Sequence, residues 1–298
     1  MNRLAVLPMV AWLVACGGPK LGPPPTTVER LNAEAVRRLD RGDDRGAEEM
    51  IRAALREAEL VDDLVGQAEA WNNLGALEMA RGKFREAWSA HATALALHQA
   101  TKVRGIGEVR TRSNLGSALL AAGKVVEARA QFEEAVTLGD KIGEGKAARL
   151  AKVGLASVAL RDGDATRALA LARDALDASG DATEGGAFAV QGAADEALGD
   201  LPLARAAYDH ALDIDRRHGV PRAVAEDLRG LARVAERSGN AGEATALLTR
   251  SSRIARRLGE RNMAVRDLER AIELSGVTAT EGKAALEEEL RALRQAPP

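Results

Sequence analysis

Apolar and small residues recur along most of the chain at spacings of three and four, which place them on one face of an α-helix. Glycines interrupt this pattern at regular distances. Intervals of 40, 41, 40, 36 and 40 residues separate Gly42, Gly82, Gly123, Gly163, Gly199 and Gly239. Self-similarity at a period of this size is the signature of a repeat array. The chain is therefore predicted to consist of stacked helical units.

Small residues follow each of these glycines at two fixed distances. The positions five and twelve residues on are Ala47, Ala54, Ala87, Ala94, Ala128, Ala135, Ala168, Ala175, Ala204, Ala211, Ala244 and Ser251. Small side chains on one stripe of a helix let a second helix approach closely, and a glycine ends a helix readily in the left-handed conformation. Each unit is thus predicted to be a helix, a tight glycine turn and a second helix. Further glycines mark the connections between units, at Gly66, Gly105, Gly143, Gly180, Gly219 and Gly259.

Six such units span about residues 28–258. The segments 262–274 and 281–295 are predicted to be two more helices with weaker register. A repeat array needs an end that covers its last stacking face, because that face would otherwise be exposed to water. Residues 259–298 are therefore expected to form a degenerate seventh unit or a cap.

The segments Trp71-Asn72-Asn73-Leu74-Gly75 and Ser113-Asn114-Leu115-Gly116, with small residues downstream, resemble the tetratricopeptide repeat. The period is nearer 40 than the usual value of about 34 for that family. The longer form is similar to the Asn-Leu-Gly repeats of kinesin light chains and related adaptors. This resemblance implies an all-α, right-handed superhelical solenoid of antiparallel helix pairs, in which the first helices line a concave groove.

Charge and composition exclude several functional classes. Lys+Arg is 42 and Asp+Glu is 44, and aromatic residues make up 2% of the chain. A net charge of −2 with few aromatic rings disfavours nucleic-acid binding. The four histidines have no metal-binding motif around them, and no nucleophile elbow or phosphate-binding loop is present in the sequence. The chain is predicted to be no enzyme and to bind no metal, cofactor or nucleic acid.

The N-terminus is predicted to be an export signal. One arginine precedes the apolar segment 4–15, whose length of about 12 residues is too short to span a bilayer. Leu13-Val14-Ala15-Cys16 resembles the lipobox of bacterial lipoproteins, which implies a signal peptide at 1–15, a lipidated Cys16 and a Gly/Pro tether at 16–27. The mature protein would face the periplasm, and Gly17 favours the outer membrane. An ordinary signal peptide cleaved nearby and an apolar cytosolic start are the alternatives.

Asn73 and Asn114 both precede Leu-Gly in consecutive units and are expected to point the same way. An amide offers both a donor and an acceptor, which suits the backbone of an extended peptide. In the Asn-Leu-Gly repeats asparagine at this position contacts peptide backbone, so the resemblance implies the same role here. The alternative is that both amides are only polar surface of the groove.

Arginines are the second set of candidate peptide-binding residues. Arg110 lies in the third unit, and Arg229, Arg233 and Arg237 lie one helical turn apart in the sixth. Their guanidinium groups would suit an acidic peptide, and the alternative is pairing with Glu226 and Glu236. The predicted function is a membrane-tethered scaffold that binds a partner protein or peptide in a concave groove. A self-associating structural lipoprotein is the alternative.

Overall fold

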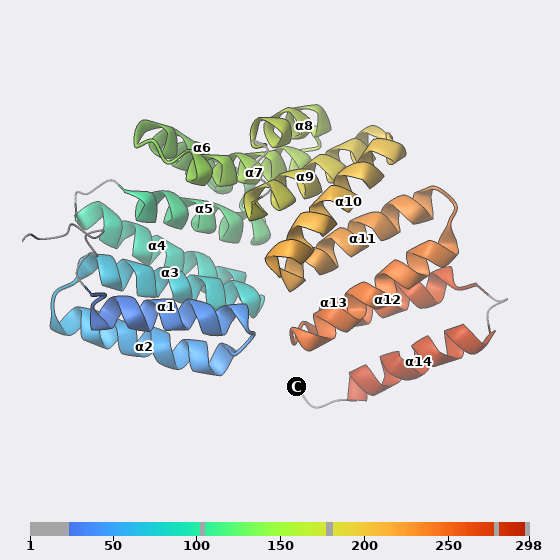
Figure 1. Cartoon of the computed structure of the whole chain (residues 1–298), viewed down its shortest axis with the longest axis horizontal. Helices are drawn as coiled ribbons and strands as arrows, with labels where there is room; N and C mark the ends of the chain where they lie inside the picture. The colour runs from blue at the N-terminus through green and yellow to red at the C-terminus, as the bar shows by residue number, and fades with distance from the viewer. Residues whose placement is uncertain (1–23, 102–104, 177–180, 277–279, 296–298) are drawn as a thin grey trace, which may run out of the picture.

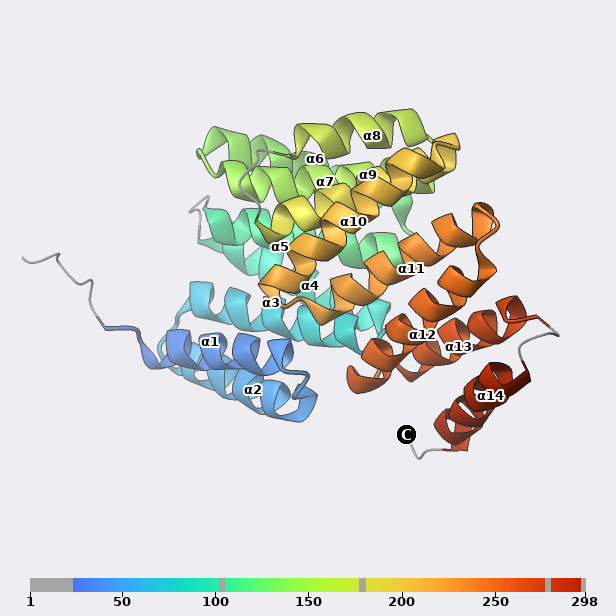
Figure 2. The ribbon, with the colours of Figure 1, turned by 45° about the vertical axis from the view of Figure 1, so that its right-hand side comes forward.

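The structure, a computed structural model, describes residues 24–101, 105–176, 181–276 and 280–295. The regular elements within these residues are all α-helices joined by short connections (Figures 1 and 2). They are α1 (Thr27–Asp40), α2 (Asp44–Leu60), α3 (Leu64–Ala80), α4 (Phe84–Ala100), α5 (Ile106–Ala121), α6 (Val125–Lys141), α7 (Gly145–Arg161), α8 (Ala165–Asp174), α9 (Ala182–Leu198), α10 (Leu201–His218), α11 (Pro221–Arg237), α12 (Ala241–Arg257), α13 (Arg261–Leu274) and α14 (Thr280–Gln295). The prediction of an all-α fold is confirmed.

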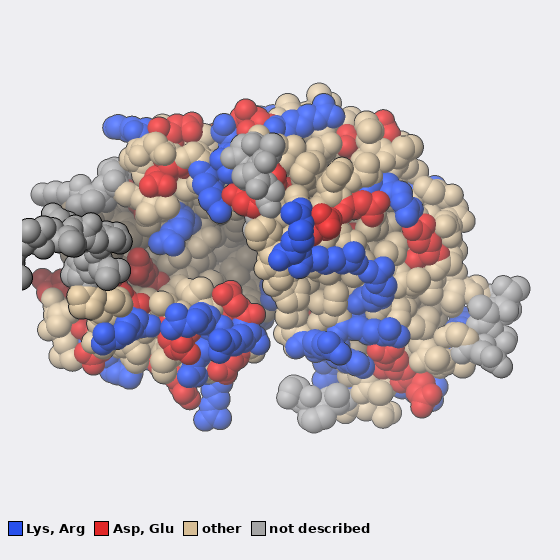
Figure 3. Space-filling model, viewed as in Figure 1, with Lys and Arg blue, Asp and Glu red and all other residues tan. Residues whose placement is uncertain are grey.

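The helices form two rows. Each odd-numbered helix packs against the even-numbered helix that follows it, and each of α1, α3, α5, α7 and α9 also contacts the next odd-numbered helix. The even-numbered helices of the described part make no comparable contact with one another. The array is therefore a solenoid of helix pairs that curves with the odd-numbered helices on its inner side. Figure 3 shows the hollow that this curvature leaves between the two halves of the molecule.

The turns within each pair have the conformation that the glycine spacing predicts. The six glycines at the 36- to 41-residue spacing have φ between 72° and 89°, a region that residues with a Cβ adopt only at a cost. All twelve small residues of the downstream stripe are completely buried. The close approach of the two helices in each unit is thus confirmed.

The glycines between units do not share one role, contrary to expectation. Gly66 lies inside α3, where a Cβ would stand 2.4 Å from Val28 Cγ1. The left-handed residue of that connection is Asp62, with φ 55°. Gly105 begins α5 with extended backbone. Left-handed glycines end the second helices at Gly143, Gly219 and Gly259, whereas Gly180 lies outside the described residues.

An aromatic ring separates the inner helices α5 and α7. Phe132 of α6 is 2% exposed, and its ring lies against glycines of both helices. A Cβ at Gly116 of α5 would lie 2.9 Å from the ring, and a Cβ at Gly154 of α7 would lie 2.2 Å from it. Real side chains do not approach so closely, so both positions need glycine for this ring to fit.

In other units, too, a side chain of the outer helix packs against the inner helices at their joint, and we call this side chain the wedge. The Tyr208 ring of α10 lies between α9 and α11, where a Cβ at Gly192 or Gly230 would be 2.9 or 2.5 Å away. His91 of α4 lies under Gly75 of α3, where a Cβ would be 2.4 Å from its ring. One residue of each of these outer helices therefore packs at the joint between two inner helices.

The size of the wedge determines what the next inner helix can carry. Gly154 and Gly230 follow the large rings of Phe132 and Tyr208, whereas Asn114 stands at the equivalent place after the smaller His91. This explains why the position held by Asn73 and Asn114 is glycine in the fourth and sixth units. The residue type at this position follows from the packing between units.

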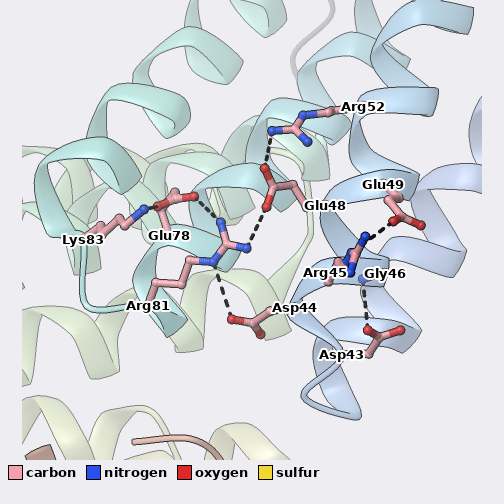
Figure 4. Close-up of polar contacts among 10 residues, drawn as sticks. All are labelled: Asp43, Asp44, Arg45, Gly46, Glu48, Glu49, Arg52, Glu78, Arg81 and Lys83. Atoms are coloured by element: carbon pink, nitrogen blue, oxygen red, sulfur yellow. Dashed lines mark hydrogen bonds and ion pairs between the residues drawn. The ribbon is translucent and has the colours of Figure 1, made fainter. Parts of the chain in front are cut away.

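Ion pairs add a second link between units, and Figure 4 shows the one between the first two. Arg81 at the end of α3 contacts Glu48 of α2 at 2.7 Å, Asp44 at 3.5 Å and Glu78 of its own helix at 2.9 Å. The hydrogen bond from Arg81 is the main reason that the pKa of Glu48 is lowered. Since Arg81 is only 23% exposed, these contacts are better shielded from salt than an ordinary surface pair.

The last pair closes the array. Leu286, Leu290 and Leu293 of α14 are buried against the apolar cluster that includes Leu268 of α13. These helices begin within one residue of the predicted segments 262–274 and 281–295 and end with them. None of the described helices has the length and apolar character that crossing a membrane requires.

The wedge interpretation predicts that one joint can be transplanted onto another. We expect His91→Phe alone to lower the midpoint of unfolding by several degrees, because its ring would overpack against Asn114 at a cost of about 1–3 kcal/mol. The triple variant His91→Phe/Asn72→Ser/Asn114→Gly copies the joint around Phe132 and should recover at least half of that loss. Thermal unfolding followed by circular dichroism measures both, and a triple variant no more stable than the single one would contradict the interpretation.

Candidate functional site

The hollow is lined by the exposed faces of the inner helices. α3 presents Val65 and Glu69 there, and α5 presents Ile106 and Arg110 at the equivalent positions one unit on. The Nη2 atom of Arg110, which is 53% exposed, lies 3.9 Å from Glu69 Oε1. This contact places the two helix faces side by side. Sequence patterns alone did not single out Val65, Glu69 or Ile106, although their register with Arg110 could have identified them.

Two carboxylates show that these positions stand in a hollow. Glu69 and Glu226 of α11 keep 37% and 62% of their side chains exposed. Even so, desolvation by the surrounding protein is the main cause that raises the pKa of each. A group that is reachable by solvent and yet surrounded by protein lies in a concave surface. The two residues therefore mark the groove at the α3 end and at the α11 end.

The floor of the groove changes character along the array. Four consecutive inner helices, α3 to α9, carry small residues at one equivalent position, and these are Ala76, Ser117, Ser157 and Ala193. In α11 and α13 the same position holds Arg233 and Arg270, which are half-exposed. Figure 3 shows basic side chains gathered over this α11 side of the hollow. The groove thus has a floor of small residues and one end rich in arginine.

Asn73 and Asn114 both donate their amide hydrogens within the fold. Asn73 Nδ2 lies 3.2 Å from Oδ1 of the buried Asn32 on α1, and Asn114 Nδ2 lies 3.2 Å from Asn72 Oδ1 on α3. Both side chains are partly exposed. Each amide therefore joins two inner helices. Its oxygen makes no hydrogen bond within the described residues and is the atom that stays available to a peptide, so the predicted role in peptide binding remains a hypothesis.

His91 completes this amide network. Its Nδ1 atom lies 2.9 Å from Asn72 Oδ1, the same oxygen that accepts from Asn114. Because an oxygen needs a donor, the proton of the neutral ring is placed on Nδ1. Burial lowers the pKa of His91 to about 4 and also lowers the pKa of His98. Both histidines pack in the interior, and the described residues contain no cluster of three potential metal ligands.

Arg233 and Arg237 share one carboxylate from the neighbouring unit. Arg233 Nε lies 3.1 Å from Glu196 Oε2, its Nη2 donates to Tyr208 Oη at 2.8 Å, and Arg237 Nη1 donates to the Glu196 backbone oxygen at 2.6 Å. Their side chains remain 51% and 46% exposed. The pairing expected with Glu236 is wrong, because Glu236 contacts Arg270 of α13 instead. One carboxylate thus offsets part of the charge of two arginines from the next unit.

The side chain of Arg229 is mostly buried, whereas it was predicted to be available to a peptide. Its side chain is 15% exposed, and Nη1 contacts Ser251 Oγ at 3.4 Å and Asp267 Oδ2 at 3.5 Å. Glu226 is 4.0 Å away. Arg229 therefore links α11 to α12 and α13, and the predicted stripe is interrupted at this position. Its neighbours Arg233 and Arg237 are the exposed part of the stripe.

A buried acid pair lies beside the α11 end of the groove. Asp215 of α10 and Asp227 of α11 are 3% and 1% exposed and hydrogen-bond to each other. Two carboxylates in contact must share a proton. Burial, then the charge of Asp215 and then that of Glu226 raise the pKa of Asp227 to about 8, with Arg216 opposing them. α9 closes the pair from its third side, where a Cβ at Gly185 would be 2.5 Å from Asp215 Oδ1.

A segment of the inner and outer helices matches a known repeat family. Residues 66–141 match the tetratricopeptide repeat family model. This segment runs from α3 to the end of α6 and contains Asn73, Arg110 and Asn114. No curated protein sequence matches the chain significantly.

Solved structures extend the likeness to nearly the whole fold. The Rap conjugation gene regulator of the plasmid pLS20, in complex with the Phr* peptide, is 15% identical, with a TM-score of 0.64 over 91% of this chain and 76% of that one. The apo form of RapI is 12% identical, with a TM-score of 0.62 over 91% and 99%. PilW, a type IV pilus biogenesis factor, is 18% identical, with a TM-score of 0.54 over 76% and 93%. At these identities the likeness shows the fold alone, a tetratricopeptide-like solenoid.

The acid pair predicts that stability falls as pH rises. Because the pKa of Asp227 is raised above its unfolded value, the contribution of the protonated pair to stability is fully present in acid and is lost between about pH 4 and pH 8. Asp227→Asn removes this loss. We expect the variant to melt a few degrees above the parent protein at pH 8 and close to it at pH 4.5. Equal melting temperatures at pH 8 would show that the pair does not titrate as described.

Proposed function

We propose that this protein is a membrane-tethered scaffold that binds a partner peptide or protein in the concave face of its solenoid. The observation that carries the proposal is the row of side chains that the inner helices leave exposed toward the hollow, with Arg110 at one end and Arg233 at the other. A small-residue floor between them leaves room for a polypeptide segment. The Rap regulator, which shares the fold, was solved with a peptide.

The tether is the second part of the proposal. It rests on the sequence around Cys16, which lies outside the described residues. A diacylated cysteine would hold the protein at the periplasmic side of an envelope membrane, since each buried methylene contributes about 0.8 kcal/mol. Non-acidic Gly17 supports the outer membrane. An assembled envelope complex is the setting that such a scaffold would serve.

Groove binding is tested by blocking the floor. Ser117 of α5 is exposed on the inner face and Ala96 of α4 on the outer face, so Ser117→Trp and Ala96→Trp add the same bulk on opposite sides. We expect a pull-down from detergent-solubilised envelopes to lose its partners with Ser117→Trp and to keep them with Ala96→Trp. The melting temperatures of both variants serve as the folding control. Partners retained by Ser117→Trp would refute the proposal.

The same preparations test the alternative, a self-associating structural protein. Light scattering after size exclusion should give the mass of one chain at every concentration if the groove serves a separate partner. A mass that rises with concentration, and returns to that of one chain in Ser117→Trp, would mean that the groove holds a second copy.

The lipid anchor predicts a simple chemical result. Growth with labelled palmitate should label the protein, and Cys16→Ser should abolish the label and release the protein from the membrane fraction, because Cys16 is the one cysteine in the sequence. Label that persists in Cys16→Ser would contradict the assignment.

A further inference from the structure

Large apolar side chains are exposed where α3 and α5 begin. Leu60 and Val61 at the end of α2 are 80% and 67% exposed, Val65 in the first turn of α3 is 47% exposed and Ile106 in the first turn of α5 is 44% exposed. We refer to these four residues as the apolar edge. Single exposed apolar residues need no explanation, but a contiguous group of them marks an interaction surface.

The register of the inner helices shows that this group is contiguous. Glu69 and Arg110 are 3.9 Å apart, and Val65 and Ile106 lie one helical turn before them on the same two faces. Val65 and Ile106 are therefore neighbours across the joint between α3 and α5. Leu60 and Val61 precede Val65 by a short connection, so they lie at the same end of these helices.

Negative charge surrounds the apolar edge. The carboxylates at the start of α1, the end of α2, the connection after it and the first turns of α3 are Glu29, Glu57, Glu59, Asp62, Asp63 and Glu69. The guanidinium groups of the same segments are those of Arg30 and Arg56, and Arg110 of α5 lies against Glu69. Two of the carboxylates, Asp63 and Glu29, interact with Glu69 closely enough to oppose its ionisation. The Arg30 guanidinium donates hydrogen bonds to Pro25 O and Thr27 Oγ1. The edge is thus apolar with an acidic surround.

We propose that the apolar edge binds a segment of the partner in which a large apolar side chain stands beside lysine or arginine. This inference rests on the proposed function, because Val65 and Ile106 continue into the concave face through Glu69 and Arg110. The apolar side chain would cover Val65 and Ile106, and the cation would lie among Asp62, Glu59 and Glu29. An acidic partner segment would meet like charge here, so this end of the groove selects for basic sequence.

The backbone of Asp62 supports a role in binding. Asp62 has φ 55°, whereas the equivalent position of three other units is glycine. Aspartate tolerates this conformation better than most residues but less well than glycine. Glycine would relax the backbone and would also remove the carboxylate, which stands between Val61 and Val65 in the sequence.

The test uses three labelled 12-residue peptides as probes and measures fluorescence anisotropy with the full-length protein in detergent. One peptide combines leucine with lysine, the second leucine with glutamate and the third serine with lysine. We expect the leucine–lysine peptide to bind about tenfold more tightly than either of the others. Equal binding of the leucine–glutamate peptide would overturn the proposal, and it would point to Lys102 and Arg104, which precede Ile106 but lie outside the described residues.

Matched variants locate the binding. Val65→Ser/Ile106→Ser should lower the affinity for the leucine–lysine peptide about tenfold. Asp62→Asn, which keeps a residue tolerated at positive φ, should lower it about threefold. The control is Val126→Ser/Leu203→Ser, which removes exposed apolar residues, 77% and 48% exposed, from the first turns of the outer helices α6 and α10. A control that loses as much affinity as Val65→Ser/Ile106→Ser would overturn the proposal.

The outcome is separable from that of the proposed function. If Ser117→Trp loses its envelope partners while the three peptides bind alike, the groove binds a partner but the apolar edge does not select it. If Ser117→Trp keeps its partners and the leucine–lysine peptide still requires Val65 and Ile106, the apolar edge binds on its own and the groove proposal fails.

Discussion

The packing of an outer-helix side chain between two inner helices is the constraint on which the rest of this structure depends. Neighbouring inner helices contact one another from α1 to α11, and the side chain packed at the joint limits how closely they meet. A ring such as Phe132 needs glycine on both sides, since no Cβ fits within 3 Å of it. The curvature, and with it the hollow, follows from a short series of such contacts repeated from unit to unit.

The fold could be predicted because its determinants are local and repeat. Glycine spacing located the turns, and the small-residue stripe located the contact within each pair, since both features need only a period to be recognised. The joints between units could not be predicted in the same way. They depend on which side chain of the outer helix meets which residue some 20 positions away, as Phe132 meets Gly154 and Tyr208 meets Gly230.

The same reasoning explains the mixed result for the candidate site. Arg110 and Arg233 are both half-exposed on inner helices, and helical periodicity determines the face on which each lies. Periodicity does not determine which carboxylate a long side chain reaches. Arg233 and Arg237 turn to Glu196 of the preceding unit, and Arg229 turns into the joint with Asp267, so most of the expected basic stripe is neutralised between units. The asparagines likewise hold neighbouring inner helices together with the atoms that were expected to contact a peptide.

Neutralisation at the arginine end makes the opposite end of the groove the more selective one. An arginine that already pairs with a carboxylate gains less from an acidic ligand, because the ligand must compete with a partner held at short range. At the α3 end the carboxylates of Glu59 and Asp62 are exposed and make no ion pair among the described residues, and they adjoin the uncovered side chains of Val61 and Val65. Burial of exposed apolar side chains and pairing with free carboxylates are the two contacts that would still contribute binding free energy. Both are concentrated where the first units begin.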